Sequence, residues 1–346
     1  MQPVATLRAA VLSLLAMALG AAPPVARAQA ADAAAPAASA AAAPRLSLSV
    51  FVANPEDLLD TNRTLLVPTA YVGLLTDGRV SAAQRSGLFS GGNNTVRASA
   101  SYKVSGIDKA FAQQLARQAL DDFVAQMRAA GFTVLTYAEV REREVFKSAQ
   151  RESATGPMGL PVLSEGGNNF VVAAPSDEQH FKSSLAGGDF AEFISGGKTR
   201  IGDATLVIPR YLFAAPQAWA EGESGYKRIS AEANVAEGMN MLQARAYWLG
   251  QPKSRMMRGI PGVATRQQVI NVTERAGSVS KTADTTPQAA NALGGLLSAL
   301  GGGGNTQRSS GEYLLTVDRD AFAHGVMNGA RAFNAEVSKV AAEAKP

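Results

Sequence analysis

The stretch "FVAQMRAAGFTVLTY" (residues 123–137) changes from the periodicity of a helix to that of a strand, and the change falls at Gly131. Before the glycine, large apolar residues recur at steps of four and eight, which places them on one stripe of a helix. After it, "FTVLTY" alternates like a strand with one buried face. Because glycine adopts the left-handed cap conformation at little cost, the stretch predicts a helix, a glycine cap and a strand.

The helix should begin near Ser105 and Asp108, which have the S-x-x-D spacing of a capping box. Burial of a large apolar side chain stabilises a fold by about 1.5–3 kcal/mol, so the apolar stripe must face a core. The stripe consists of Ile107, Phe111, Leu115, Leu120, Phe123, Val124 and Met127.

Strands are predicted on both sides of this helix. Upstream candidates are "RLSLSVFV" (45–52), "RTLLVPTAYVGLL" (63–75) and "VRASASYKV" (96–104). Downstream candidates are "FVVAA" (170–174), "ATLVIPRYLF" (204–213), "KRISAEANV" (227–235), "MNMLQARAYWL" (239–249) and "RQQVINVTE" (266–274). In the segment 63–75, Pro68 has no backbone N–H to donate to a neighbouring strand, so it is expected at a sheet edge or a bulge.

Two more helices complete the pattern. Residues 138–153 are expected to form a helix with a charged, solvated face. The chain closes with the strand "EYLLTVD" and a helix from Arg319, for which Asp318 is the expected N-cap. Its apolar stripe consists of Phe322, Val326, Ala330, Phe333, Val337 and Val340. This order predicts an α+β fold, in which helices pack on a mixed sheet with antiparallel strands in the middle of the chain.

The first 28 residues have the pattern of a secretory signal peptide. Arg8 precedes an apolar core, and Ala26-Arg27-Ala28 supplies a small-x-small cleavage pattern, so we expect cleavage between Ala28 and Gln29. Residues 29–44 are an Ala/Pro linker, and residues 45–346 are expected to form one α+β domain. Within that domain, residues 277–311 are low in complexity and are expected to form a flexible loop.

Composition excludes several classes of function. The predicted signal peptide holds two of the 33 Lys and Arg and none of the 29 Asp and Glu, which leaves 31 basic and 29 acidic residues and a net charge of +2. This charge does not indicate nucleic-acid binding. The chain contains no cysteine, which excludes disulfides, thiolate zinc sites, thiol nucleophiles and a lipid-modified N-terminal Cys.

Known catalytic and cofactor motifs are incomplete, so we assign no catalytic, cofactor or metal residue. "SGGKT" (195–199) resembles a phosphate loop, but Glu192 stands where the first glycine is required. His180 is expected to be a solvated helix residue, and metal sites need three or four ligands. His324 lies four residues after Asp320 on one helix face, which indicates an ion pair and leaves a metal pair or an acid–base pair open.

Two features are candidates for an interaction surface. Trp219 has polar neighbours and is expected to be exposed at a loop, whereas Trp248 on an alternating strand is expected in the core. Inside the expected loop 277–311, a short apolar helix stripe is formed by Leu293, Leu296, Leu297 and Leu300. These leucines either fold back on the core of their own chain or form a docking or membrane-surface element.

The order of elements resembles the curli-secretion channel family and related envelope assembly factors. The resemblance is carried by "LLVPTAYVGLL", the long helix, "AAGFTVLTY", the charged helix, "FVVAA" and "EYLLTVDRDAFAHGVMNGA". It implies an α+β periplasmic protein with no catalytic residues to carry over, and it does not imply a channel. The chain departs from that family because it lacks the lipidated N-terminal Cys.

We therefore expect an exported protein of the periplasm or the extracellular space that binds or assembles with other envelope components. Its partner would be an envelope protein or a second copy of the chain, with peripheral membrane contact as a further possibility and no nucleic acid or cofactor. Two alternatives are a secreted hydrolase whose carboxylates meet only in the fold and a periplasmic protein that binds a small ligand.

Overall fold

The computed structural model describes residues 46, 48–53, 63–85, 95–182, 204–224, 229–249, 262–267, 269–289, 291–292 and 306–344. All of them belong to one compact unit, Pro44–Pro346. This unit packs helices on a mixed sheet, which confirms the predicted α+β class. The predicted signal peptide, with Ala28 and Gln29, and the predicted linker lie outside the described residues.

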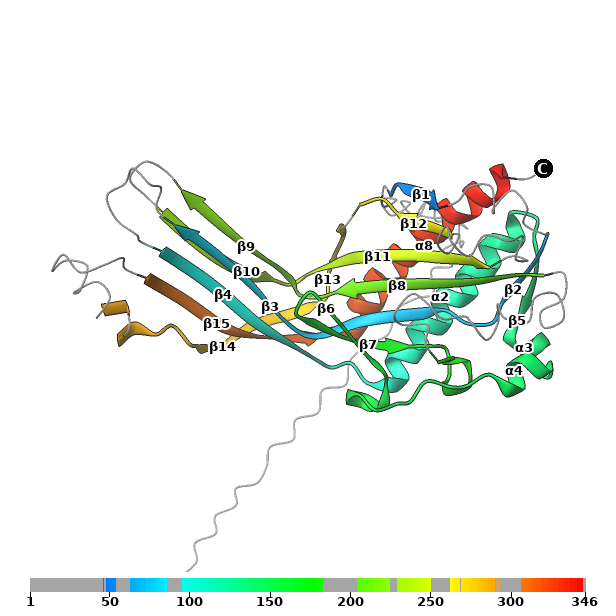
Figure 1. The fold of residues 1–346 in the computed structure, drawn as a ribbon, viewed down its shortest axis with the longest axis horizontal. Coiled ribbons are helices and arrows are strands. Elements are labelled where there is room, and N and C mark those ends of the chain that lie inside the picture. Colours follow the sequence, from blue (N-terminus) through cyan, green and yellow to red (C-terminus); the bar gives the residue numbers. More distant parts are fainter. Residues whose placement is uncertain are drawn as a thin grey trace, which may run out of the picture. The chain divides into compact units, whose positions relative to one another are not determined.

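A large mixed sheet forms the body of the unit (Figure 1). Its strands are β1 (Val50–Ala53), β2 (Thr64–Val67), β3 (Tyr71–Arg85), β4 (Thr95–Ser105), β5 (Thr133–Thr136), β6 (Val162–Glu165), β7 (Asn168–Ala173), β8 (Thr205–Ala214), β11 (Gly238–Leu249), β12 (Gly262–Thr265), β13 (Ile270–Arg275), β14 (Gly277–Asp284) and β15 (Thr306–Val317). The main path runs β1-β12-β11-β8-β3-β4-β15-β14. A separate pair is formed by β9 (Gln217–Ser224) and β10 (Ile229–Ala236).

The direction of the strands changes along the sheet. The strands β8, β11, β12 and β13 from the middle of the chain pair antiparallel, as the sequence predicts. Parallel pairs join β3 with β8, β2 with β5 and β4 with β15. The pair of β4 and β15 links the two ends of the chain, because the last strand lies beside an early one.

Two long helices cover one face of the sheet. They are α2 (Lys109–Ala129) and α8 (Arg319–Glu343), and Phe111 and Phe322 pack between them with ring centroids 6.1 Å apart. The two predicted stripes point into the largest core cluster, where Phe123, Met127 and Phe333 are fully buried. Within the α8 stripe, Val340 is half-buried.

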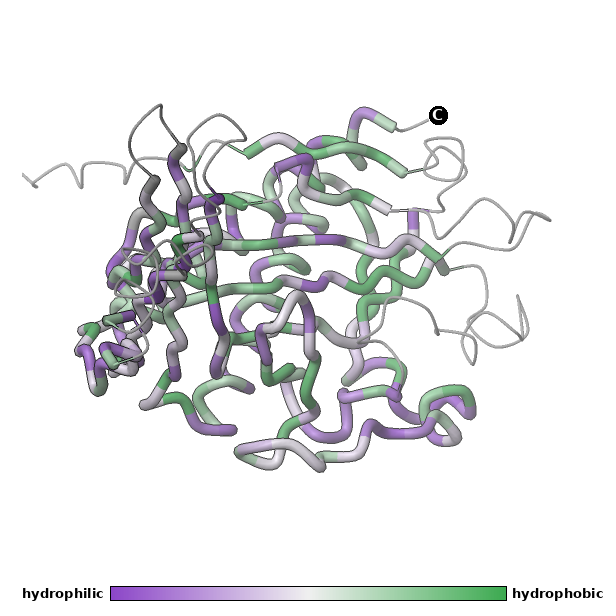
Figure 2. Tube along the Cα trace, turned by 60° about the vertical axis from the view of Figure 1, so that its left-hand side comes forward, coloured by the Kyte–Doolittle hydropathy of each residue, from purple (hydrophilic) through white to green (hydrophobic). Residues whose placement is uncertain are grey.

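The other face of the sheet carries a second core. It is covered by the short helices α3 (Tyr137–Val140) and α4 (Glu144–Ser148), from which Phe146 packs beside Phe181 at a centroid distance of 5.9 Å. Strand β8 lies between both cores, and all of its residues except Ala214 are buried. Figure 2 colours the chain by residue hydropathy and shows hydrophobic and hydrophilic residues following each other along the strands and helices.

The predicted glycine cap is confirmed. Gly131 has a φ of 86°, and its N–H donates to Arg128 O while Phe132 N–H donates to Met127 O, which is the Schellman arrangement. The start of the helix differs from the prediction. Asp108 is itself the N-cap and accepts from Phe111 N–H, whereas Ser105 ends β4 and donates to Leu315 O. The intervening Gly106 has a φ of 93°, so the chain turns between strand and helix there.

At the other end of the chain, Asp318 is the N-cap of α8, as predicted, and accepts from Asp320 N–H and Ala321 N–H.

Three predicted segments need correction. The expected strand 63–75 is divided into β2 and β3, because the chain leaves the ladder at Pro68. The expected helix 138–153 is only α3 and α4, and Arg151 forms a strand bridge with Phe181. The expected flexible loop 277–311 is wrong at both ends, because β14 and β15 pair from Gly277–Val317 to Asp284–Gly311.

A buried polar chain ties both long helices to β8. Tyr211 Oη donates to Asn334 Oδ1 at 2.6 Å, and Asn334 Nδ2 donates to Asp122 Oδ2 at 2.8 Å. Burial raises the pKa of Tyr211 well above its ordinary value, so the phenol stays a proton donor. A satisfied network of this kind fixes the position of the helices on the sheet.

Substitution of Gly131 should destabilise the fold. A β-branched residue resists positive φ, so we expect Gly131→Val to lower the free energy of unfolding by more than about 1 kcal/mol. Asparagine tolerates positive φ better than valine does, so Gly131→Asn should lower the free energy of unfolding by less. Urea unfolding of both variants measures the difference, and equal stabilities would contradict the role of the positive φ.

Removal of one hydroxyl should break the buried network. In Tyr211→Phe, Asn334 Oδ1 loses its donor inside the core, and an unsatisfied buried acceptor costs about 1–3 kcal/mol. Urea unfolding measures this loss. Tyr313→Phe on the half-buried part of β15 is the matched control and should stay close to wild type. A wild-type free energy for Tyr211→Phe would show that the hydrogen bond does not stabilise the fold.

Candidate interaction surface

Several strands continue beyond the part of the sheet that the helices cover. On β3, Leu74 is the last residue that packs in the core under the helices, and Val104 on β4 is the next one. The described residues between them lie outside this core. We call residues 77–85, 95–103 and 306–314, together with β9 and β10, the strand arm. Figure 1 shows these strands running away from α2 and α8.

The strand arm has two layers. Gly78, Val80 and Ala82 alternate with exposed residues on β3 and face the pair β9–β10. Val80 and Tyr102 share a small core cluster with Ala218 of β9 and Val235 of β10. The opposite side chains of β3, β4 and β15 therefore form an open face, because successive residues of a strand point to opposite sides.

A hydrogen-bonded group holds the base of the arm. Tyr102 Oη donates to Asn168 Oδ1 at 2.8 Å, and Asn169 Nδ2 donates to Asp77 Oδ1 at 2.7 Å. Burial and the nearby Asp77 raise the pKa of Tyr102 to about 12, so its phenol remains a donor. A Cβ on Gly78 would lie 2.0 Å from Asn168 Oδ1, so only glycine leaves room for this group.

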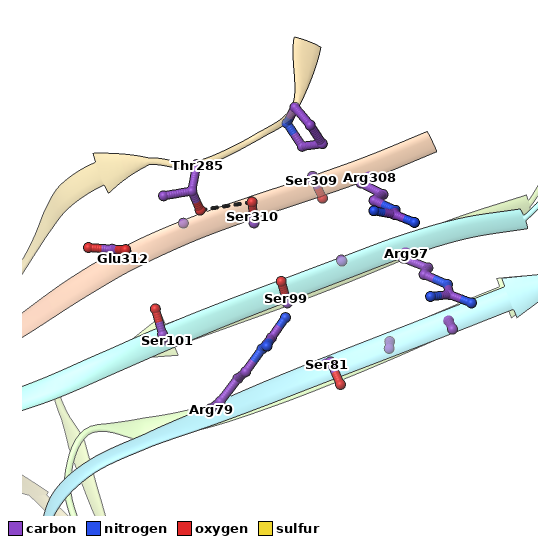
Figure 3. Close-up of a pocket in the computed structure, with 15 residues that line it drawn as sticks. Arg79, Ser81, Arg97, Ser99, Ser101, Thr285, Arg308, Ser309, Ser310 and Glu312 are labelled. Atoms are coloured by element: carbon purple, nitrogen blue, oxygen red, sulfur yellow. Dashed lines mark hydrogen bonds between the residues drawn. The ribbon is translucent and has the colours of Figure 1, made fainter. Parts of the chain in front are cut away.

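The open face carries four exposed arginines, Arg79, Arg85, Arg97 and Arg308, and we call it the arginine face. The register places its side chains in the rows Ala83–Arg97–Arg308, Ser81–Ser99–Ser310 and Arg79–Ser101–Glu312. Together with Thr285 and Pro287 they line a hollow of about 640 Å³ (Figure 3). Within the described part of the chain, the guanidinium groups of Arg79, Arg97 and Arg308 make no ion pair or hydrogen bond, so they are free to bind an anionic group.

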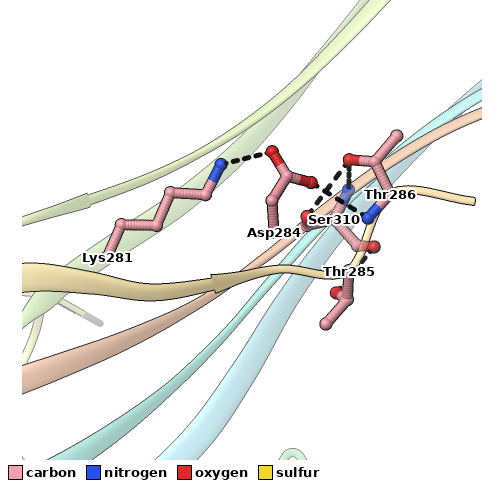
Figure 4. Close-up of polar contacts among 5 residues, drawn as sticks. All are labelled: Lys281, Asp284, Thr285, Thr286 and Ser310. Carbon is pink, nitrogen blue, oxygen red and sulfur yellow. Dashed lines mark hydrogen bonds and ion pairs between the residues drawn. The ribbon is translucent and has the colours of Figure 1, made fainter. Parts of the chain in front are cut away.

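The segment after β14 forms one wall of this hollow. Thr286 Oγ1 donates to Ser310 O, and Thr285 Oγ1 donates to Ser310 Oγ at 2.8 Å. Asp284 accepts from Lys281 Nζ and from Thr286 N–H (Figure 4). These hydrogen bonds, with that from Lys281 first, lower the pKa of Asp284, so the carboxylate stays charged.

Asn291 extends the wall along β15. Its Nδ2 donates to Arg308 O at 2.7 Å, and its Oδ1 accepts from Arg308 N–H at 2.9 Å. The backbone of Arg308 is therefore fixed next to Arg97 although its guanidinium is exposed.

The far side of the arm carries exposed acidic residues, and we call it the glutamate face. On β9 and β10 the register pairs Glu221 with Glu232, and Glu223 lies two residues further along β9. All three are exposed and make no ion pair with any residue that the structure describes. The inner residues Ala218 and Val235 pack on β3 and β4, so the glutamate face and the arginine face lie on opposite sides of the arm.

Trp219 belongs to the glutamate face. It is 42% exposed, as predicted, but it lies on strand β9 opposite Asn234 and not on a loop. Trp248 is buried in the core, as predicted, and Tyr247 is buried as well. The other candidates, Leu293, Leu296, Leu297 and Leu300, lie outside the described residues, as does "SGGKT" (195–199).

His180 is buried, so its interpretation as a solvated helix residue is wrong. It follows a single 3₁₀ turn (Asp177–Gln179), and its ring lies 5.3 Å from that of Tyr71. Its Nε2 has no hydrogen-bond partner among the described residues. Burial lowers the pKa of the imidazole from its ordinary 6.5 to about 4, against the opposing effect of Glu152 and Asp177. The ring is therefore a neutral core residue at pH 7.

His324 pairs with a carboxylate other than the one expected. Its Nδ1 lies 3.3 Å from Glu274 Oε1 on β13, which also accepts from Asn328 Nδ2 at 2.7 Å. Asp320 is only one turn away on α8, but no ion pair joins it to His324. Over the described ranges, no three His, Asp or Glu side chains come close enough together to hold a metal ion.

Sequence reasoning missed both charged faces of the arm. A signal was present only for the glutamate face, because "AEGES" on β9 alternates charged with small residues. The segments were interpreted separately, however, and only the register shows that Arg97 faces Arg308 and that Glu221 faces Glu232. Such a pairing is spatial and has no local signature.

Comparison of the chain with protein-family models, with curated proteins and with solved structures gave no match. None of the described helices is both long enough and apolar enough to cross a lipid bilayer.

The burial of His180 makes stability depend on pH. Below about pH 6.5 the unfolded chain binds a proton that the folded protein binds only near pH 4, so wild type should lose stability as the pH falls through this window. The shift corresponds to a loss of roughly 3 kcal/mol. His180→Phe should remove this part of the pH dependence, as measured by urea unfolding at pH 7.5 and pH 4.5.

The remaining carboxylates titrate in both proteins and therefore cancel in this comparison. Parallel stability curves for wild type and His180→Phe between these two pH values would contradict the neutral, buried state of the ring.

Proposed function

We propose that this chain is an exported, non-catalytic envelope protein that acts by binding or assembling with other envelope components. The signal-peptide pattern of residues 1–28 supports export to the periplasm or the extracellular space. The resemblance to the curli-secretion channel family and related envelope assembly factors supports the same class. The strand arm is the observation that carries the proposal.

The strand arm is built as a surface for contact. Its outward faces hold exposed charges that have no partner within the described chain, and it lies beyond the core that the helices stabilise. In the described residues, no strand pairs with the outer edge of β14, and β9 and β10 pair only with each other. Exposed strand edges of this kind accept a strand from a partner.

The two alternatives receive less support. A hydrolase would need convergent carboxylates near a cleft, but among the described residues that line the hollow of the arm Glu312 is the single carboxylate. A small-ligand binding protein would need an enclosed apolar pocket. The hollow on the arginine face is lined instead by arginine and serine side chains on exposed strands.

Trp219 gives a test of this proposal. Truncation of an exposed aromatic anchor weakens an interface without loss of core packing, so we expect Trp219→Ser to lose its partner and keep the wild-type melting temperature. The measurement is recovery of crosslinked partners from intact cells. Phe51→Ser is the matched control, because Phe51 is 43% exposed and Trp219 is 42% exposed, but Phe51 lies on β1 outside the arm.

Unchanged recovery with Trp219→Ser would remove this face of the arm from the interface. If wild type recovers no partner and shows turnover that depends on one acidic or imidazole group, the non-catalytic function is wrong.

A further inference from the structure

In two places on the arm, side chains of like charge lie directly opposite each other on neighbouring strands. Arg97 on β4 is the register partner of Arg308 on β15, and Glu221 on β9 is the register partner of Glu232 on β10. Like charges in directly opposite positions destabilise a sheet. None of these four side chains has an ion-pair partner within the described chain, so no described residue of the same copy offsets the repulsion.

The two pairs match in spacing and differ in sign. Each pair spans two neighbouring strands, which lie about 4.8 Å apart, so each presents two charges at nearly the same separation. The pairs lie on opposite sides of the two-layered arm. One copy therefore cannot bring its own glutamates to its own arginines, whereas a second copy can.

We propose that the pair Glu221/Glu232 of one copy docks on the pair Arg97/Arg308 of a second copy. This inference rests on the proposed function in assembly and names the partner as the chain itself. The contact is heterologous, because each copy uses a different face on each side. Copies then add head to tail, which gives a ring where the rotation closes and a filament where it does not.

The neighbouring rows also match. Beside the glutamate pair lies the uncharged row of Trp219 and Asn234, and beside the arginine pair lies an uncharged row of serines that includes Ser99. An indole next to guanidinium groups adds a cation–π contact. Glu312 also lies on the arginine face, so this face is not uniformly basic, as a surface for a dense polyanion would be.

Charge reversal tests the proposal. The purified protein is compared with R97E/R308E, with E221R/E232R and with the quadruple variant that carries all four changes, by sedimentation velocity over a range of concentrations. Each double variant places like charges on both faces, so its self-association should be weaker than wild type by about tenfold or more. The quadruple variant should regain self-association, and so should an equimolar mixture of the two double variants.

A matched control has reversals outside the arm. R266E/K339E changes two exposed basic residues on other elements by the same amount and should self-associate like wild type. The melting temperatures of all variants should agree, because every reversed side chain is exposed. Raising the salt from 0.05 M to 1 M should weaken wild-type association, since the Debye length falls to about 3 Å.

Several results would overturn the inference. They are a monomeric wild type at every concentration, double variants that associate like wild type, or a mixture that fails to associate. Loss in R97E/R308E alone, with E221R/E232R unaffected, would also overturn it, because the arginine face would then contact a surface of the second copy other than the glutamate pair. The proposed function is tested separately by crosslinked recovery from cells, so it can stand when these outcomes remove the second copy as partner.

Discussion

Burial of strand β8 on both faces is the constraint on which the other elements depend. A strand that is apolar on both sides needs cover on both sides. The long helices α2 and α8 supply one cover, and α3, α4 and the segment around Phe181 supply the other. The network from Tyr211 of β8 through Asn334 to Asp122 then fixes both long helices at one position along the sheet.

The same constraint explains where the arm begins. On β3, residues up to Thr76 are buried, but from Gly78 onward half-buried and exposed residues alternate. One face of the continuing strands is covered by β9 and β10, and the other is open. A strand that leaves a two-sided core must change from an apolar run to alternation, and β3 makes this change within one continuous element.

The fold could be predicted to the extent that it depends on local periodicity. The stripe of α2, the cap at Gly131 and the apolar run of β8 each occupy one short segment, and each was found from that segment. The predicted loop 277–311 failed because polar, glycine-rich sequence can still pair: β14 gains its order from β15, far along the chain. The prediction of a solvated His180 failed for the same reason, because Tyr71, which packs against the imidazole, comes from a strand far away in the sequence.

The charged faces mark the limit of single-segment reasoning and indicate what the arm is built for. Nothing in "TVRASASYK" or in "TQRSSGEY" requires that Arg97 and Arg308 meet, yet the parallel register brings them together. A sheet stabilised for its own sake would place opposite charges there, because opposite-charge pairs stabilise neighbouring strands and like charges destabilise them. The arm instead repeats the unfavourable choice on its other side with Glu221 and Glu232. Two such pairs of opposite sign lie on two faces of one thin element, and this unfavourable arrangement is the reason for proposing a second copy as the partner.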